Sequence, residues 1–233
     1  VGDSLGMTML GYSGTVGVTV DDMVYHIKTV VKGAPNTFVI GDMPFGSYNV
    51  DLAEAVRSAN KIFAEGHCDC VKLEGGADMA PVIKAIVKAG IPVCAHIGLT
   101  PQTSALMGGF KVQGKSLEAA QKLLDDARAV EEAGAFMIVL EGIPAALAKV
   151  ITEKVSIPTM GVGAGASCDM QVLVAQDMLG MNAWVPKFAK KFADLRTIII
   201  DAYNTYAKEC NERSFPDTDH QYNTVIEGIE NLK

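Results

Sequence analysis

Polar residues stand at the ends of several short apolar runs of this chain, and their types suit proton transfer and metal binding. If the runs are parallel strands, their carboxyl ends meet at one face, so the polar side chains would converge there. Carboxylates gathered at one place repel one another unless protons or a cation lie among them. An all-oxygen ligand set selects a hard divalent ion, most often Mg²⁺, that keeps positions open for water or substrate. The residues concerned are Asp3, Asp42, Lys72, Glu74, His96 and Glu141.

Each of these residues also has a structural explanation. An acid at the junction of a strand and a loop is often a helix cap or a turn former. Lys72 lies inside an apolar run, so we expect it to pair with an acid, and that pair is either structural or directed at a substrate. Side chains alternate along a strand, so Lys72 and Glu74 point to the same side. His96 is more typical of a histidine satisfied in the core, or one that supports a ligand, than of a metal ligand.

Other motifs carry weaker signals. The glycines of Gly161–Gly165 either cradle a phosphate or allow a tight turn. Cys68 and Cys70 lack a second metal-type pair, and the five cysteines fit buried thiols in a reducing compartment better than a disulfide framework. Asp125 and Asp126 are most simply solvated on a helix face.

Amphipathic stretches alternate with the apolar runs along most of the chain. Strands that are apolar on both faces and alternate with helices indicate a parallel sheet covered by helices. An open doubly wound sheet is one solution, but acids at the strand ends favour a (β/α)8 TIM barrel in a single domain over residues 1–233. Predicted helices cover 24–31, 52–63, 82–87, 120–130 and 147–155, and predicted strands cover 38–42, 70–74, 91–97, 136–140 and 157–162, with 1–3 as the end of another strand.

Composition excludes several classes of protein. With 49% hydrophobic residues, the 233-residue chain has enough apolar side chains for a sizeable core. Its net charge of −7 and scattered basic residues argue against a nucleic-acid or anionic-membrane partner. The apolar runs are far shorter than the roughly 20 residues that span a bilayer. The chain is slightly short for a barrel of about 250 residues, and about seven strands are visible, so we expect a missing strand to precede Val1.

Eight motif blocks follow one another in the sequence in the same order as in the ketopantoate hydroxymethyltransferase family, and the chain resembles that family. The resemblance runs from residue 1 to about Tyr222, and we expect the polar segment 223–233, which extends beyond it, to be a C-terminal tail. The blocks are Val1–Met7, Gly41–Tyr48, Val71–Gly76, Ala95–Gln102, Lys111–Gly114, Val139–Glu141, Gly161–Gly165 and Cys168–Gln171.

The resemblance implies a (β/α)8 barrel, with an N-terminal helix before Val1, and a reaction. Members of the family transfer a hydroxymethyl group from 5,10-methylenetetrahydrofolate to 3-methyl-2-oxobutanoate, through a Mg²⁺-stabilised enolate, and form 2-dehydropantoate. By this resemblance Asp3, Asp42 and Glu74 surround the magnesium ion, and Glu141 abstracts the proton. Ser4, Lys72 and His96, together with Asp3 and Asp42, would contact the keto acid.

The resemblance further implies a homo-oligomer, a decamer, located in the cytoplasm if the source is bacterial and in mitochondria if it is eukaryotic. Two alternatives stay open at this point. One is a related barrel enzyme that acts on phosphoenolpyruvate or isocitrate, although its loop motif Lys-Lys-Cys-Gly-His does not occur in the sequence. The other is a truncated, non-catalytic barrel that binds a keto acid or a partner.

Overall fold

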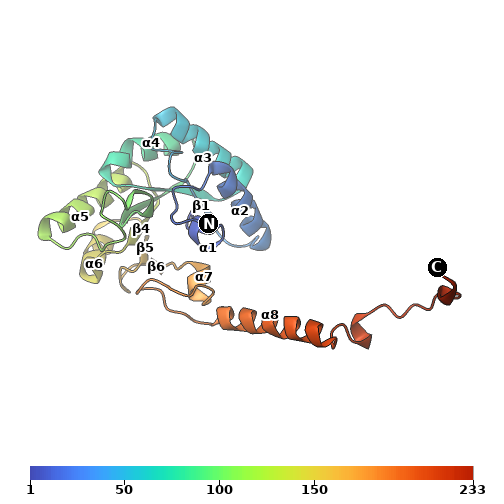
Figure 1. Cartoon of the computed structure of the whole chain (residues 1–233). Helices are drawn as coiled ribbons and strands as arrows, with labels where there is room; N and C mark the ends of the chain where they lie inside the picture. Colours follow the sequence, from blue (N-terminus) through green and yellow to red (C-terminus); the bar gives the residue numbers. More distant parts are fainter. Residues whose placement is uncertain (233) are drawn as a thin grey trace. The chain divides into compact units, whose positions relative to one another are not determined.

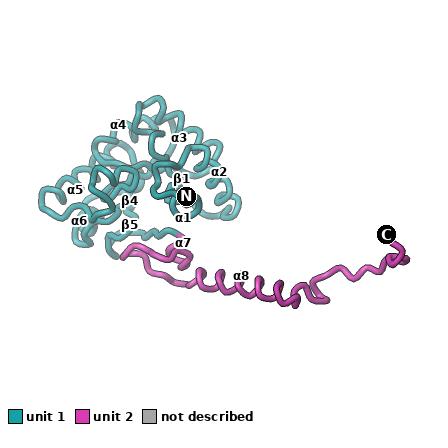
Figure 2. The backbone as a smooth tube through the Cα atoms, in the orientation of Figure 1, with its two compact units in different colours: residues 1–174 teal, residues 175–233 magenta. Residues whose placement is uncertain are grey.

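A computed structural model gives the structure of the chain and describes residues 1–232. The chain divides into two compact units, residues 1–174 and residues 175–233, which Figure 2 shows in two colours. All the residues predicted to do chemistry belong to the first unit.

Parallel strands and helices alternate through the first unit. The six strands form one sheet in the order of the chain, and helices lie around it (Figure 1). The strands are β1 Ile40–Asp42, β2 Cys70–Glu74, β3 Val93–Gly98, β4 Met137–Glu141, β5 Thr159–Val162 and β6 Met170–Gln171. The helices are α1 Leu5–Thr8, α2 Val20–Gly33, α3 Leu52–Gly66, α4 Ala80–Lys88, α5 Leu117–Glu132 and α6 Ala145–Lys154, with short 3-10 turns η1 Ala77–Met79 and η2 Pro101–Thr103.

The predicted alternation of helices and parallel strands is confirmed, with three differences. Residues 1–3 are not a strand, although the Asp42 backbone N–H donates to the Val1 carbonyl at 3.1 Å, so this segment runs beside β1. Within residues 1–232 no pairing joins β6 to β1, so the curled sheet is not a closed eight-stranded barrel. The short β6, Met170–Gln171, was not predicted, because two residues carry no periodicity.

The two faces of the sheet bury different side chains, because successive residues of a strand point to opposite sides. Val71, Leu73 and Ile138 belong to the large core that includes the covering helices. Cys70, Cys94, Met137 and Val139 form a second, smaller cluster on the other face. Counting by two from these residues places Lys72, Glu74, His96 and Glu141 on that second face. The apolar floor of this face therefore ends in a layer of charged groups at the carboxyl ends of the strands.

The prediction of buried thiols rather than a disulfide framework is confirmed. All five cysteines are free, and all but Cys210 are buried. Burial raises the pKa of Cys68 to about 11 and that of Cys94 to about 12, so these thiols stay protonated and unreactive at neutral pH.

The second unit is built around one long helix. It contains α7 Ala175–Met178, α8 Leu195–Glu212 and two 3-10 turns, η3 Thr218–His220 and η4 Ile229–Asn231. Asp194 caps the start of helix α8, because its side chain accepts a hydrogen bond from the Thr197 backbone N–H. The helix ends before Arg213, which adopts a left-handed conformation. Among the described residues, no helix has the length and apolarity needed to cross a membrane.

Candidate active site

Strand register decides which predicted site residues become neighbours. Asp42 of β1 lies opposite Lys72 of β2, and Glu74 of β2 lies opposite His96 of β3. Glu141 of β4 lies opposite Gly98 of β3. Residues scattered over a hundred positions of sequence therefore meet on adjacent strand ends, as the sequence predicted.

Lys72 pairs with an acid, as expected from its place in an apolar run. Its Nζ lies 3.2 Å from Asp42 Oδ2, and the side chains are only 14% and 6% exposed. Burial alone would lower the pKa of Lys72, but the carboxylates of Asp42, Glu74 and Asp3 outweigh it and raise that pKa above its usual range. Lys72 is therefore charged. Its ammonium group forms an ion pair with Asp42, and the charges of Glu74 and Asp3 also stabilise it.

Asp3 is held against the end of β1 and is buried. Its backbone N–H donates to Asp42 Oδ2 at 3.1 Å, and its own Oδ2 accepts from Gln102 Nε2 at 2.8 Å. Burial, and next the negative charge of Asp42, raise the pKa of Asp3 to about 7, although Lys72 acts in the opposite direction. The three carboxyl groups of Asp3, Asp42 and Glu74 therefore outnumber the single ammonium group of Lys72.

This shift predicts that the metal-free protein loses stability as pH rises from about 4 to 7. In the unfolded chain Asp3 releases its proton near its ordinary pKa of 3.8, whereas the folded protein retains it up to about 7. The unfolded state therefore gains stability over that interval, and the loss is constant above it. Urea unfolding with a chelator present should show the loss, and Asp3→Asn should flatten it. A wild-type profile that stays flat over this interval would contradict the assignment.

His96 lies between the carboxylate of Glu74 and that of Glu141. Its Nδ1 is 3.4 Å from Lys72 Nζ and 3.7 Å from Glu74 Oε1. Because an ammonium group only donates, Nδ1 is the acceptor in its contact with Lys72, and this contact assigns the ring proton to Nε2. Nε2 is 3.3 Å from Glu141 Oε2, but it makes no properly directed hydrogen bond. The structure thus presents a buried, unpaired N–H donor beside the carboxylate of Glu141.

Gly98 allows Glu141 and His96 to approach each other. It adopts φ = +96°, and a Cβ atom at this position would lie 2.2 Å from the Glu141 carbonyl oxygen. Any other residue would force β3 and β4 apart at the point where they deliver the two side chains. The glycine after the apolar run is therefore part of the site and not only a stop signal.

Ser4 stands next to the carboxylates but is less tightly held. It is half-buried before α1, and its side chain makes no capping hydrogen bond. A Cβ atom on Gly2 would lie 3.0 Å from Ser4 Oγ and 3.3 Å from Asp42 Oδ2, so both oxygens border the same small space. All seven predicted site residues thus lie in one connected cluster.

The donor chemistry of Asp3, Asp42 and Glu74 fits a hard cation. All three carboxylates are buried, and burial also raises the pKa of Glu74. In residues 1–232, however, no three His, Cys, Asp or Glu side chains are already arranged so that they could hold a metal ion. Asp3 and Asp42 are the adjacent pair, and Glu74 is separated from Asp3 by Gln102, which donates to both.

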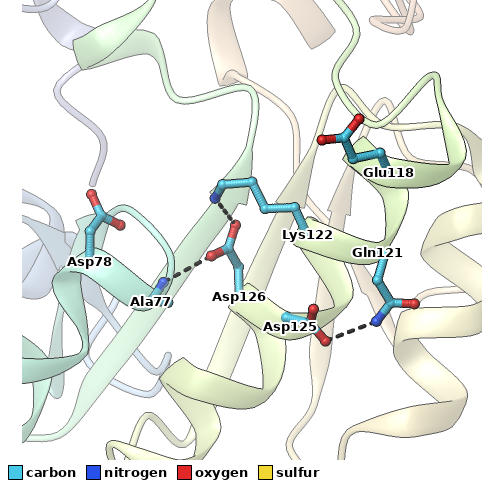
Figure 3. A pocket seen from close by; sticks show the side chains of 7 residues that line it. All are labelled: Ala77, Asp78, Glu118, Gln121, Lys122, Asp125 and Asp126. Atoms are coloured by element: carbon cyan, nitrogen blue, oxygen red, sulfur yellow. Dashed lines mark hydrogen bonds and ion pairs between the residues drawn. The ribbon is translucent and has the colours of Figure 1, made fainter.

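Asp126 departs from the expectation that it is solvated. It is buried on α5, where Oδ1 accepts from the Ala77 backbone N–H at 3.0 Å and Oδ2 accepts from Lys122 Nζ at 2.6 Å (Figure 3). A Cβ atom on Gly76 would lie 2.3 Å from Asp126 Cγ, so the loop after Glu74 approaches the carboxylate as closely as its backbone permits. The pocket drawn in Figure 3 is lined by no predicted site residue, but Asp126 also borders a second cavity that Glu74 lines, and it holds the loop that follows Glu74.

Asp126→Ala should destabilise the protein by about 1–3 kcal/mol, because it removes an acceptor from a partly buried backbone N–H. The matched variant is Asp125→Ala. Asp125 is 60% exposed and bonds only along its own helix, so its loss should change little. Chemical denaturation of both variants measures the difference. Equal effects would show that Asp126 does not hold the loop.

Sequence reasoning missed Gln102 and Tyr48, which complete the site. Both are buried, and the Tyr48 hydroxyl donates to Gln102 Oε1 at 2.6 Å. Both lie inside motif blocks that were recognised, at the ends of Gly41–Tyr48 and Ala95–Gln102, but neither bears a charge that draws attention. Tyr48 also borders a cavity of about 370 Å³ that reaches Glu74 and Gly98.

Comparisons with known proteins agree on one family. The family model described as ketopantoate hydroxymethyltransferase matches residues 1–218. Two similar relatives bear the name 3-methyl-2-oxobutanoate hydroxymethyltransferase. The protein of Heliobacterium modesticaldum is 56% identical over a region that covers 95% of this chain and 81% of the relative. The protein of Clostridium novyi is 57% identical over a region that covers 94% of this chain and 80% of the relative. A relative of the same name from Syntrophomonas wolfei is 51% identical over all 233 residues and 84% of its own length, so the similarity extends through 223–233, which the motif blocks had left outside.

A solved structure supports the fold. Phosphonopyruvate hydrolase superimposes with a TM-score of 0.52 over 97% of this chain and 79% of its own, at 13% identity. That likeness concerns the fold alone, whereas the sequence matches cover nearly the whole chain at more than half identity. They favour the main interpretation of the motif blocks over a phosphoenolpyruvate or isocitrate enzyme, and the chain belongs to the ketopantoate hydroxymethyltransferase family.

Proposed function

We propose that this protein transfers a hydroxymethyl group from 5,10-methylenetetrahydrofolate to 3-methyl-2-oxobutanoate and forms 2-dehydropantoate. The family membership and the names of the relatives support this reaction. The observation that carries it is the arrangement of Glu141 and His96 beside three buried carboxylates and one ammonium group. Such a site suits removal of a proton from carbon next to a carbonyl group.

Asp3 and Asp42, with Glu74, are the residues that would hold Mg²⁺. When bound, this ion would polarise the oxygens of the keto acid and make its C3 proton more acidic. The ordered backbone contact between Asp3 and Asp42, together with the burial of both, supports a pair of carboxylates prepared for a cation. Oxygen ligands in this number leave positions for substrate and water.

Lys72 and His96 would bind the keto acid, and Glu141 would take its proton. Lys72 is the cation of the cluster, and it can face the negative oxygens of a keto acid. The unpaired Nε2–H of His96 can donate to a substrate oxygen, and Ser4 Oγ, which borders the same space as Asp42 Oδ2, can donate as well. Glu141 Oε2 lies beside that donor, so a substrate bound to His96 brings its C3–H towards the carboxylate.

After the proton has moved to Glu141, the electron pair left on C3 forms a C–C bond to the one-carbon unit of the folate. The two C–N bonds of that unit break, one water supplies the hydroxyl oxygen, and the two folate nitrogens take up the C3 proton and a proton of that water, so tetrahydrofolate leaves. The protein's task in this step is to hold the reactants together. The same proposal includes a homo-oligomer, expected as a decamer. It also includes a cytoplasmic location, which the bacterial origin of the relatives supports.

The decisive experiment follows the C3 proton. Incubation with 3-methyl-2-oxobutanoate in deuterated water should exchange C3–H when Mg²⁺ is present and stop when a chelator is added. Adding 5,10-methylenetetrahydrofolate should then yield 2-dehydropantoate. Binding of the keto acid with neither exchange nor product would replace this proposal by the non-catalytic alternative.

A further inference from the structure

Gln102 contacts several residues of the proposed catalytic cluster, and the proposed function gives it no role. It follows β3 in the 3-10 turn η2 and is only 4% exposed. Its Nε2 donates to Asp3 Oδ2 at 2.8 Å and to the Met43 carbonyl at 2.9 Å. Its backbone N–H donates to Glu74 Oε2 at 3.0 Å. One residue therefore contacts two of the three proposed magnesium carboxylates.

The surrounding hydrogen bonds fix the orientation of the Gln102 amide. The Tyr48 oxygen accepts from the Glu74 backbone N–H at 3.3 Å, and its single proton goes to Gln102 Oε1. Oε1 therefore faces Tyr48, and the two Nε2 hydrogens face Asp3 and Met43. The flipped amide would set Oε1 against the Met43 carbonyl oxygen, and these two acceptors repel each other. Each donor of the amide has one acceptor.

We propose that Gln102, held by Tyr48, is the positioning residue that sets the carboxylates of Asp3 and Glu74 for the cation. It binds Oδ2 of Asp3 and Oε2 of Glu74, and so leaves the other oxygen of each carboxylate for a ligand. This inference rests on the proposed function, because the cation belongs to it. Gln102 itself contacts neither the cation nor the reacting atoms.

The chemistry of this position requires a neutral donor. A carboxylate at residue 102 would bring a further negative charge within 3 Å of Asp3. The carboxylates there already outnumber the one ammonium group, that of Lys72. An apolar side chain would leave Asp3 Oδ2 and the Tyr48 hydroxyl buried without their partner. An amide satisfies both groups and adds no charge.

Gln102→Met tests the proposal, because it nearly preserves the volume and removes the polar contacts of the side chain. Mn²⁺ is the probe, titrated calorimetrically into protein freed of metal. Loss of a group that orients a ligand typically costs about ten- to a hundredfold in metal affinity, and we expect that loss here. Gln121→Met is the matched control, since Gln121 is exposed and bonds to Asp125 on its own helix. It should bind Mn²⁺ as the wild type does.

Tyr48→Phe provides a second variant in case Gln102→Met fails to fold. It removes one hydroxyl and leaves the bond from Gln102 to Asp3, so the loss of affinity should be smaller but measurable. If Gln102→Met and Tyr48→Phe both bind Mn²⁺ with wild-type affinity and only their melting temperatures fall, the positioning role is overturned.

Crystal structures of the metal-free wild type and Gln102→Met separate this inference from the proposed function. If the wild type binds no Mn²⁺, the proposed metal chemistry fails, but a displaced Asp3 carboxylate in the variant still supports positioning by the Gln102 side chain, while the backbone N–H of residue 102 continues to hold Glu74. An Asp3 carboxylate that keeps its wild-type orientation without the amide would refute it.

Discussion

Glu141→Gln should abolish deuterium exchange at C3 of 3-methyl-2-oxobutanoate while the keto acid still binds. An amide preserves the shape of the side chain but cannot accept the proton, and loss of a positioned base typically costs a factor of about 10²–10⁴. The carboxylate is 15% exposed and lies at the end of β4, so the substitution buries no new charge and should leave folding intact. Proton NMR of the keto acid in deuterated water measures the rate.

The matched control for this prediction is Glu132→Gln, an exposed residue at the end of α5. It should exchange at the wild-type rate. Exchange that survives Glu141→Gln would remove Glu141 from the role of base and direct attention to another group of the cluster. A parallel measurement of keto-acid affinity distinguishes a lost base from a lost binding site, because only the latter raises the dissociation constant.

The sequence predicted the fold well where periodicity was strong. Strand β2 has the predicted bounds, Cys70–Glu74, because an apolar run there is followed by two glycines that end it. The closing pairs of a barrel were not predictable in this way. Pairing between first and last strands depends on curvature and register over the whole sheet, and no local pattern encodes it.

The site divides along a similar line. Charged residues at strand ends were found from sequence because topology alone brings parallel strand ends together. Gln102, Tyr48 and Asp126 were missed because their roles arise from contacts between distant segments; Asp3 and Gln102, for example, are 99 positions apart in the sequence. A helix-face aspartate and a loop glutamine look alike whether they are solvated or buried. Only packing distinguishes them.

Lys72→Met should destabilise the metal-free protein by about 3–5 kcal/mol, because it leaves Asp42 buried without its cation. The exposed pair Lys61–Asp21 is shorter, at 2.5 Å against 3.2 Å, yet Lys61→Met should matter little because water screens both of its charges. Burial, and not distance, therefore decides the effect. Urea unfolding of the two variants in the presence of a chelator measures it.

The double variant Lys72→Met, Asp42→Asn shows whether charge or packing causes the loss. If the uncompensated carboxylate is responsible, neutralising it should recover at least half of the lost stability, because the two changes remove both members of one pair. Lowering the pH should help the single variant more than the wild type, since protonation then neutralises the same acids. Losses that simply add would mean that Lys72 acts through its hydrocarbon chain. Lys72 would then not be the group that neutralises these carboxylates, and its proposed role in binding a negatively charged substrate would lose its support.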